Sequence, residues 1–243
     1  MAVFDRQDDK SIKKWCKWQW NPITGCQHDC GYCPAVDKVR NLYSRTRNEG
    51  FSTFLPRLWP ERFDAPYKTL IPEGNTSGNR NVMVGSLGDV FGDWVEREHI
   101  ETLLDIVRDT PQWNYILLTK NPKRYLEFEL PRNCWVGVKI DNQQEVKSAI
   151  GYLEQIDASV KFVSCDPMVV WLRFPTFDPF DWIIIGPKPK TKKRAAFNPP
   201  KMWVSSLAKQ AWASDCKVFA KHLKDPQYRS YPGDAKPTPG GPS

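Results

Sequence analysis

The sequence predicts an α/β protein built around a mostly parallel sheet, on two observations. From residue 81 onward, short apolar runs alternate with stretches whose apolar residues recur at helical spacing. The apolar runs lack the polar alternation of half-exposed strands, which indicates strands covered on both faces. Strands separated by helices form parallel βαβ units. Roughly six or seven such units suit either a doubly wound sheet or a partial (β/α) barrel, and no G-x-G-x-x-G motif supports a dinucleotide-binding sheet.

The N-terminal third is expected to contribute one strand, a cysteine-rich loop and a basic helix. Trp18 and Trp20 alternate at strand period, and the Pro-Ile-Thr-Gly stretch at residues 22–25 then breaks the strand. Residues 34–48 are basic and compatible with a helix. Residues 50–80 are rich in Pro, Gly and Asn, so we expect a surface loop there.

The remaining elements follow from apolar runs and apolar helix faces. Ile100, Leu103 and Val107, for example, share one face of an amphipathic stretch. We expect a single domain over residues 15–225, a polar lead-in over residues 1–14 and a flexible Pro/Gly-rich tail over residues 226–243. Strands are expected at residues 81–85, 115–119, 134–140, 160–164, 182–186 and 217–220, and helices at 96–110, 122–130, 145–156 and 200–213.

The composition excludes several classes of protein. Of the 243 residues, 40 % are hydrophobic and 26 % charged, which rules out a wholly disordered chain. The longest apolar runs are about five residues, far short of the ~20 that a spanning helix needs, so no membrane association is expected. The polar N-terminus shows no secretory signal, which predicts a cytoplasmic protein. A net charge of +7 permits a polyanionic partner.

Three of the seven cysteines fall in one short loop and point to a metal centre. An odd number of cysteines without an export signal argues against a disulfide framework. Cys26, Cys30 and Cys33 form a C-x3-C-x2-C motif, so a single loop can wrap their sulfurs around one centre. Sulfur ligands select zinc, copper(I) or an iron–sulfur cluster.

The donor set favours an iron–sulfur cluster among these. Structural zinc requires four ligands, and only His28 is at hand as the fourth. A redox-active thiol loop is a further alternative. A [4Fe-4S] cluster held by three cysteines leaves one iron open for a substrate or cofactor. The spacing is similar to that of the radical S-adenosylmethionine (SAM) superfamily, in which an aromatic residue such as Tyr32 usually precedes the third cysteine.

The chain also resembles the phage-encoded three-cysteine-motif proteins, a radical SAM-like family of phages and bacteria. The resemblance starts with Trp-Asn-Pro-Ile-Thr-Gly-Cys at residues 20–26 and Cys-Gly-Tyr-Cys at residues 30–33. It runs in order over about residues 18–221, although the loop after Gly186 differs from the family pattern. Further matching blocks are Ser-Leu-Gly-Asp-Val-Phe at 86–91, Leu-Thr-Lys-Asn-Pro at 118–122, Trp-Val-Gly-Val at 135–138, Phe-Val-Ser-Cys-Asp-Pro at 162–167 and Asp-Trp-Ile-Ile-Ile-Gly at 181–186.

This resemblance implies both a fold and a chemistry. The fold would be a partial (β/α)6 barrel of radical SAM type, with parallel strands and the active site at their carboxyl ends. SAM would bind the open iron, and an electron donor would drive its cleavage to a 5′-deoxyadenosyl radical. The basic balance and the phage-type family suggest a DNA, RNA or nucleotide substrate in a bacterium or phage-infected host cell. The alternative is a nucleic-acid-binding protein whose iron–sulfur or zinc site is only structural.

Polar residues at the strand ends are the expected cofactor contacts. The segment containing Gly85, Ser86, Gly88 and Asp89 resembles the one that contacts the SAM amino group in radical SAM enzymes. A turn followed by a helix cap would explain the same residues. Asp141 and Asn142 follow the strand expected at residues 134–140 and are candidates for binding the SAM ribose hydroxyls. A cap for the following helix explains them equally well.

Three residues are candidates for catalysis. Lys120 would meet a carboxylate or phosphate at the sheet edge, unless it is an ordinary solvated lysine. Cys165 would give a hydrogen atom to a substrate radical if it faced the cavity, although a small buried hydrophobe is the favoured interpretation. Asp166 cannot be buried without a partner for its carboxylate.

A basic loop follows the sixth strand on the expected active face. The sequence Pro-Lys-Pro-Lys-Thr-Lys-Lys-Arg at residues 187–194 carries five positive charges. Such a run is either a phosphate-backbone contact or a solvated loop. We take it as the candidate polyanion site, which comprises Lys188, Lys190, Lys192, Lys193 and Arg194.

Overall fold

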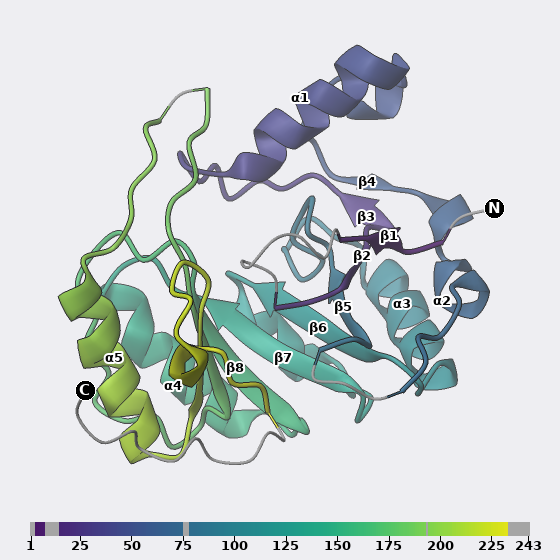
Figure 1. Cartoon of the computed structure of the whole chain (residues 1–243). Helices are drawn as coiled ribbons and strands as arrows, with labels where there is room; N and C mark the ends of the chain where they lie inside the picture. Colours follow the sequence, from purple (N-terminus) through teal and green to yellow (C-terminus); the bar gives the residue numbers. More distant parts are fainter. Residues whose placement is uncertain (1–2, 8–14, 75–77, 193, 233–243) are drawn as a thin grey trace.

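Parallel strands lying side by side in chain order form the main sheet of the computed structural model (Figure 1). The structure describes residues 3–7, 15–74, 78–192 and 194–232. Among the described strands of this sheet, β1 alone runs antiparallel to its neighbour, β2. The main sheet has the order β1 (Asp5–Arg6), β2 (Trp18–Trp20), β5 (Asn81–Val84), β6 (Asn114–Thr119), β7 (Cys134–Lys139), β8 (Val160–Cys165), β9 (Trp182–Ile185) and β10 (Lys217–Ala220), and β3 (Ile23–Thr24) pairs with β4 (Arg57–Leu58) in a second, small sheet.

Helices occupy the connections between the strands. The longest follow the cysteine loop and the strands β5, β7 and β9. The expected loop over residues 50–80 contains several short elements, and the helix expected over residues 122–130 is a shorter 3-10 helix, η3. The helices are α1 (Pro34–Thr46), α2 (Ala65–Lys68), α3 (Arg97–Asp109), α4 (Gln144–Gln155) and α5 (Lys201–Ala213), with 3-10 turns η1 (Glu49–Phe51), η2 (Pro60–Arg62), η3 (Pro122–Glu127) and η4 (Pro226–Tyr228).

The strand order confirms a mostly parallel α/β sheet and excludes the doubly wound alternative. A doubly wound sheet reverses its strand order at a switch point, whereas the order here never reverses across the described residues. Within these residues the sheet also stays open and does not close into a barrel. Because all parallel strands point the same way, their carboxyl ends meet at one edge.

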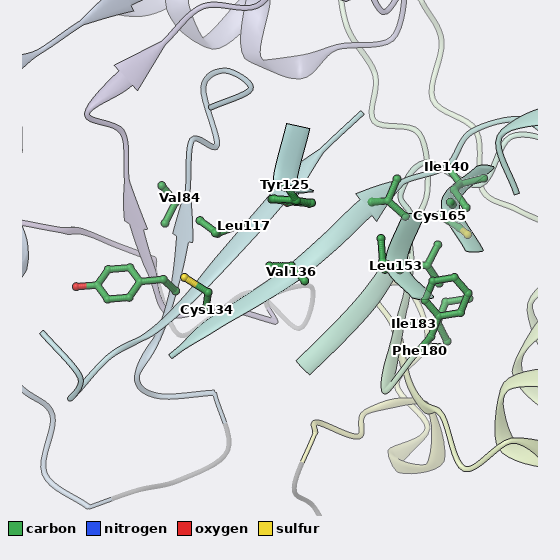
Figure 2. Packing of buried hydrophobic residues seen from close by; sticks show 14 of the residues in the cluster. Val84, Leu117, Tyr125, Cys134, Val136, Ile140, Leu153, Cys165, Phe180 and Ile183 are labelled. Carbon is green, nitrogen blue, oxygen red and sulfur yellow. The ribbon is translucent and has the colours of Figure 1, made fainter. Parts of the chain in front are cut away.

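The main hydrophobic core lies between the sheet and its helices. Apolar faces of α3, α4 and α5 pack against the same side of the strands, through residues such as Leu103, Leu153 and Leu207. Figure 2 shows part of this packing, in which Val136 of β7, Ile183 of β9 and Leu153 of α4 gather in one layer. Burial of this apolar area is the main force that holds the helices on the sheet.

The opposite face of the sheet is covered by aromatic side chains. Trp135, Phe162 and Trp182 project from β7, β8 and β9 into a second cluster. Trp15 covers them, with its ring 5.8 Å from Trp182 in an edge-to-face arrangement. Tyr231 approaches Trp182 from the C-terminal side, at 5.6 Å between ring centroids. Aromatic rings therefore cover this face of the sheet.

Segments near both ends of the chain take part in these layers. Phe4 is buried between Trp18 and Trp113, and the adjacent β1 pairs with β2. Near the other end, the backbone N–H of Ser230 donates to Val218. The remainder of the expected lead-in, residues 1–2 and 8–14, and the tail at residues 233–243 lie outside the described residues. No helix in the described part of the chain is long and apolar enough to cross a membrane.

Two glycines allow the cysteine loop to sit against the sheet edge. The backbones of Gly25 and Gly88 approach each other as a parallel bridge. A Cβ atom on Gly88 would lie 2.6 Å from the Gly25 carbonyl oxygen, closer than real contacts allow. Gly25 itself has φ +87°, which favours glycine. The first cysteine follows immediately, so this contact positions the loop.

We expect Gly88→Ala to destabilise the protein by about 1–3 kcal/mol, because the added methyl group overpacks the junction. The matched control is Gly151→Ala in α4, where a Cβ atom meets nothing within 4 Å. The control should be more stable than the parent by up to about 1 kcal/mol, since alanine is the better helix former. Urea unfolding of both variants measures the difference, and equal stabilities would contradict the assigned contact.

Candidate functional site

A cavity of about 790 Å³ opens at the carboxyl edge of the sheet. Its size is typical of a site for a small ligand or cofactor. The cysteine loop forms one wall, and strand-end residues such as Lys120 and Asp166 form others. Trp15, Met83 and Leu118 line it as apolar surface. Most of the strand-end residues that the sequence analysis singled out line this cavity.

The three loop cysteines separate this cavity from a second one. Cys26, Cys30 and Cys33 line both the main cavity and a smaller cavity of about 450 Å³, which extends toward α1. All three thiols are free and partly buried. A turn joins the last two, because the Cys33 N–H donates to the Cys30 carbonyl at 2.9 Å. Among the described residues, however, no group of three or more His, Cys, Asp or Glu side chains is close enough to hold a metal ion.

The Cys26 thiol has a raised pKa. Burial raises its pKa to about 12, and the nearby acidic groups Asp89, Cys30 and Cys33 add to this increase, while a hydrogen bond with the His28 backbone opposes it. The free thiol is therefore protonated near neutral pH. Because thiolates are the metal-binding form, any metal that binds here must displace this proton.

The Asp89 side chain, which follows β5, hydrogen-bonds both to the cysteine loop and to the end of β6. His28, which lies between the first two cysteines, hydrogen-bonds through Nε2 to Asp89 Oδ2 at 2.8 Å. The Thr119 hydroxyl and the Lys120 backbone N–H donate to the same oxygen at 2.9 and 3.0 Å. Asp89 Oδ1 accepts from the Phe91 N–H at 3.0 Å. Nε2 of the His28 ring is thus engaged by a carboxylate, which leaves Nδ1 as the ring nitrogen through which His28 would act as a fourth metal ligand.

A second tie connects the loop to β6 and β7. The Tyr32 hydroxyl donates to Asp141, just after β7, and the Lys120 ammonium group donates to the same carboxylate oxygen at 2.6 Å. Lys120 also lies 3.5 Å from Glu145. Tyr32 further stacks beneath the Lys139 ammonium group, which lies 4.9 Å from its ring centre. The aromatic residue before the third cysteine is therefore held by two charged residues at the end of β7, and Lys120 after β6 shares the Asp141 carboxylate with it.

These contacts shift the pKa values of all three groups. Burial alone would raise the pKa of Asp141, but hydrogen bonds from Lys120 and Tyr32 outweigh it and lower that pKa. Burial would likewise lower the pKa of Lys120, yet its bond to Asp141 and the nearby acidic groups raise it. Burial and the Asp141 hydrogen bond raise the pKa of Tyr32, so that it stays protonated. Lys120 is an ion-paired residue, and not the solvated lysine of the alternative interpretation.

Of the other expected cofactor contacts, some line the main cavity and others hydrogen-bond to the protein backbone. Gly85, Ser86 and Gly88 line the main cavity beside the cysteines. The Ser86 hydroxyl donates to Gln19 at 3.0 Å. Asn142 accepts from the Glu145 N–H at 3.2 Å at the start of α4, which is the cap that the alternative interpretation expected. Neither Asn142 nor Asp141 lines the cavity directly.

The two candidates at the end of β8 lie on opposite sides of the sheet. Cys165 is fully buried in the core between sheet and helices, where Figure 2 shows it, and does not line the cavity. It therefore fits the favoured interpretation of a small buried hydrophobe. Asp166 lines the cavity and forms an ion pair with Lys221 of the last strand end. Of the three candidate catalytic residues, Lys120 and Asp166 therefore line the cavity and Cys165 does not.

The basic loop forms an arm that stands beside α1 (Figure 1). We call residues 186–199 the arm. Its two sides pair at Lys188 and Phe197, and a turn closes between Thr191 and Arg194. Lys188 and Lys190 line the main cavity. At the tip, the Lys192 N–H donates to Asp37 of α1 at 2.8 Å. Lys193 lies outside the described residues.

The structure adds site residues that the sequence analysis did not single out. Trp15, Lys38, Lys139 and Lys221 line the main cavity together with the expected residues. Lys139 and Lys221 each stand at the carboxyl end of a strand, so the strand-end rule applied to every strand would have found them. The sequence carries no comparable signal for Trp15 or Lys38, because their placement depends on how the chain folds back over the sheet.

We expect Asp141→Asn to destabilise the protein by about 1–2 kcal/mol at neutral pH, because hydrogen bonds to a charged group are lost. The lowered pKa of Asp141 means that its contribution exists above about pH 4 and fades as the pH falls through its folded-state pKa. The raised pKa of Lys120 means that the contribution of the pair also fades above about pH 10. Urea unfolding of the parent and the variant at several pH values measures the difference in their free energies of unfolding. This difference should be constant between about pH 4 and pH 10 and shrink outside that range.

The matched control is Asp105→Asn, which removes the carboxylate of an exposed ion pair with Arg108 on α3. Its effect should stay within about 0.5 kcal/mol, because solvent screens exposed pairs. A control effect as large as that of Asp141→Asn, or a difference that persists unchanged at pH 3, would contradict the assigned network.

Comparison with known proteins places the chain in a family without assigning it an activity. A family model described as "Protein of unknown function (DUF5131)" matches residues 10–229. No curated protein and no solved structure matches the chain. The radical SAM chemistry and the phage origin implied by the resemblance therefore stay predictions. Because the matched region covers most of the 243 residues, the protein belongs to the DUF5131 family.

Proposed function

We propose that the protein is a radical SAM enzyme that acts on a nucleic acid or nucleotide. The observation that carries the proposal is the position of the cysteine loop. Its three free cysteines line one cavity of about 790 Å³ at the carboxyl edge of a parallel sheet. In α/β folds of this kind, ligands bind at that edge.

The finer fold assignment belongs to this proposal. A partial (β/α)6 barrel of radical SAM type has parallel strands in chain order with its helices on one side. The strand order and the shared helix-covered face support that assignment. The aromatic face would then correspond to the inside of the partial barrel, and the cavity to its mouth.

The residues present fit a [4Fe-4S] cluster in kind and position. Three sulfur donors on one loop are the ligands that such clusters use. The loop has the glycine and turn that a tight wrap requires, at Gly25 and at Cys30–Cys33. Since no group of metal-binding side chains converges among the described residues, binding requires the thiols to turn toward a common centre. The second cavity behind the loop leaves room for that movement.

The ties beneath the loop would hold such a cluster in place. When bound, the cluster with SAM supplies a 5′-deoxyadenosyl radical after one-electron reduction by an external donor. His28 and Tyr32, held by Asp89 and Asp141, fix the loop relative to the sheet. Gly85 and Ser86 are the candidate contacts for SAM, because they line the cavity next to the cysteines. Asp89 and Asp141 act by positioning, since their oxygens are already engaged by the chain.

The remaining walls would bind the substrate. Asp166 and Lys221 present a paired carboxylate and ammonium group to the cavity. The arm lies over the cavity with Lys188 and Lys190, which suit a phosphate group.

We expect anaerobic reconstitution with iron and sulfide, followed by one-electron reduction, to give a four-iron electron paramagnetic resonance signal that changes on addition of SAM. The Cys26→Ala, Cys30→Ala and Cys33→Ala variants should each lose that signal, because each removes a ligand. The Cys16→Ala variant is the matched control, since Cys16 lines the same cavity outside the loop and should keep the signal.

Product analysis completes the test. The reduced protein should convert SAM to methionine and 5′-deoxyadenosine, and the loop variants should not. Tight binding of zinc with no iron cluster and no response to SAM would overturn the proposal. That outcome would leave the alternative, a nucleic-acid-binding protein with a structural metal site.

A further inference from the structure

The main cavity carries positive charge that the described chain does not neutralise. Six lysines line it, against the two carboxylates of Asp89 and Asp166. Asp89 is engaged by His28 and by donors of β6, and Asp166 by Lys221. The lining lysines are Lys38, Lys120, Lys139, Lys188, Lys190 and Lys221.

Three of these lysines have neither an ion-pair partner nor an aromatic partner among the described residues. Lys120 is paired with Asp141, and Lys221 with Asp166. Lys139 lies over the Tyr32 ring. Lys38 of α1, and Lys188 and Lys190 of the arm, line the cavity without such a partner in the parts of the chain that the structure covers. Ammonium groups gathered in a concave site create a field that attracts anions.

The floor of the same cavity is apolar and aromatic. Trp15, Met83 and Leu118 line it below the lysines. Trp15 is 6 % exposed and rests on the aromatic face of the sheet. The Lys221 ammonium group lies 5.2 Å from the centre of the Trp15 ring, so the floor offers a base an apolar packing surface and not an open ring face, while phosphates bind to lysine and arginine. The combination therefore suits a nucleotide unit, with its phosphate near the arm and its base deeper in the cavity.

The positive charge continues beyond the cavity. Arg40 of α1 lines the second cavity, together with Thr191 at the tip of the arm. The Arg194 guanidinium group lies near Gly31, at 3.7 Å from the position of an added Cβ atom. Asp37 faces the same region, but its carboxylate accepts the Lys192 backbone N–H. A single nucleotide in the main cavity would not also reach Arg40 across the cysteine loop.

We infer that the substrate is a single-stranded nucleic acid whose backbone follows the basic surface from the arm to Arg40 while one base enters the main cavity. This inference rests on the proposed function and narrows its substrate class. A paired base would first have to be flipped out of its duplex at a cost of about a few kcal/mol, so a strand with an unpaired base fills the cavity more readily. A free nucleotide would use the cavity lysines alone.

Binding of a labelled oligothymidylate strand, followed by fluorescence anisotropy between about 50 and 200 mM salt, tests the inference. The logarithm of the affinity should fall linearly with the logarithm of the salt concentration. The Lys188→Gln/Lys190→Gln variant should make this negative slope shallower by about 1.4, since each phosphate contact on a single strand contributes about 0.7 to its magnitude. The matched control is Lys147→Gln/Lys209→Gln, which removes the same charge from exposed positions on α4 and α5 and should leave the slope unchanged.

Arg40→Gln distinguishes a strand from a nucleotide. This variant should make the salt slope for the strand shallower by about 0.7. The concentration of thymidine monophosphate that displaces the labelled strand should stay unchanged. Equal weakening for the strand and the monophosphate would overturn the assignment to a polymer. Equal or tighter binding of the matching duplex, equal competition by polyglutamate, no binding of the strand, or a control slope that becomes as shallow as that of the arm variant would each overturn the inference.

The measurement is made on the full chain with and without reconstituted iron. Strand binding requires only the basic surface, so it should persist in the Cys30→Ala variant. If the unmodified protein gives no iron signal after reconstitution but still binds the strand, the radical SAM proposal alone is refuted. A SAM-responsive cluster without strand binding would refute this inference alone.

Discussion

The site depends above all on one buried carboxylate, that of Asp89. It is 5 % exposed and accepts hydrogen bonds from His28, Thr119, the Lys120 backbone and the Phe91 backbone. A buried charge is tolerated only when donors surround it. Those donors come from the cysteine loop, from the end of β6 and from the turn after β5, so one side chain joins three segments that are distant in the sequence. The loop is consequently anchored whether or not a metal is bound.

The parallel sheet supplies the second constraint. Because its strands run in chain order, every connection after a strand begins at the same edge. The cysteine loop, the Lys120 and Asp141 pair and the arm all leave from that edge, and their side chains share a cavity or its supporting contacts. The same order places the helices on one face. The other face is left to aromatic rings, which form the floor of the cavity.

Sequence patterns predicted the strands and helices well where the spacing of apolar residues matches the face that is buried in the folded protein. The apolar runs become β5 to β10, and the amphipathic stretches become α3, α4 and α5. The prediction was less accurate over residues 122–130, where a 3-10 helix ends at Glu127. Phe128 leaves that helix in an extended conformation, and its ring packs 6.0 Å from Phe91. Such a tertiary contact overrides a local helical preference and carries no signal in a local pattern.

The amino-acid sequence by itself determined the parallel α/β class, the cysteine loop and the list of polar strand ends, because periodicity and spacing are local properties. Only the tertiary structure decided what each polar residue does. Asp141 supports Tyr32 and Lys120, Asn142 caps α4, and Cys165 faces the core. A strand places successive side chains on opposite faces, and pairing of charges depends on which segments meet across the sheet edge. Those choices are made when the chain packs, through contacts between residues such as Asp166 and Lys221 that are 55 positions apart.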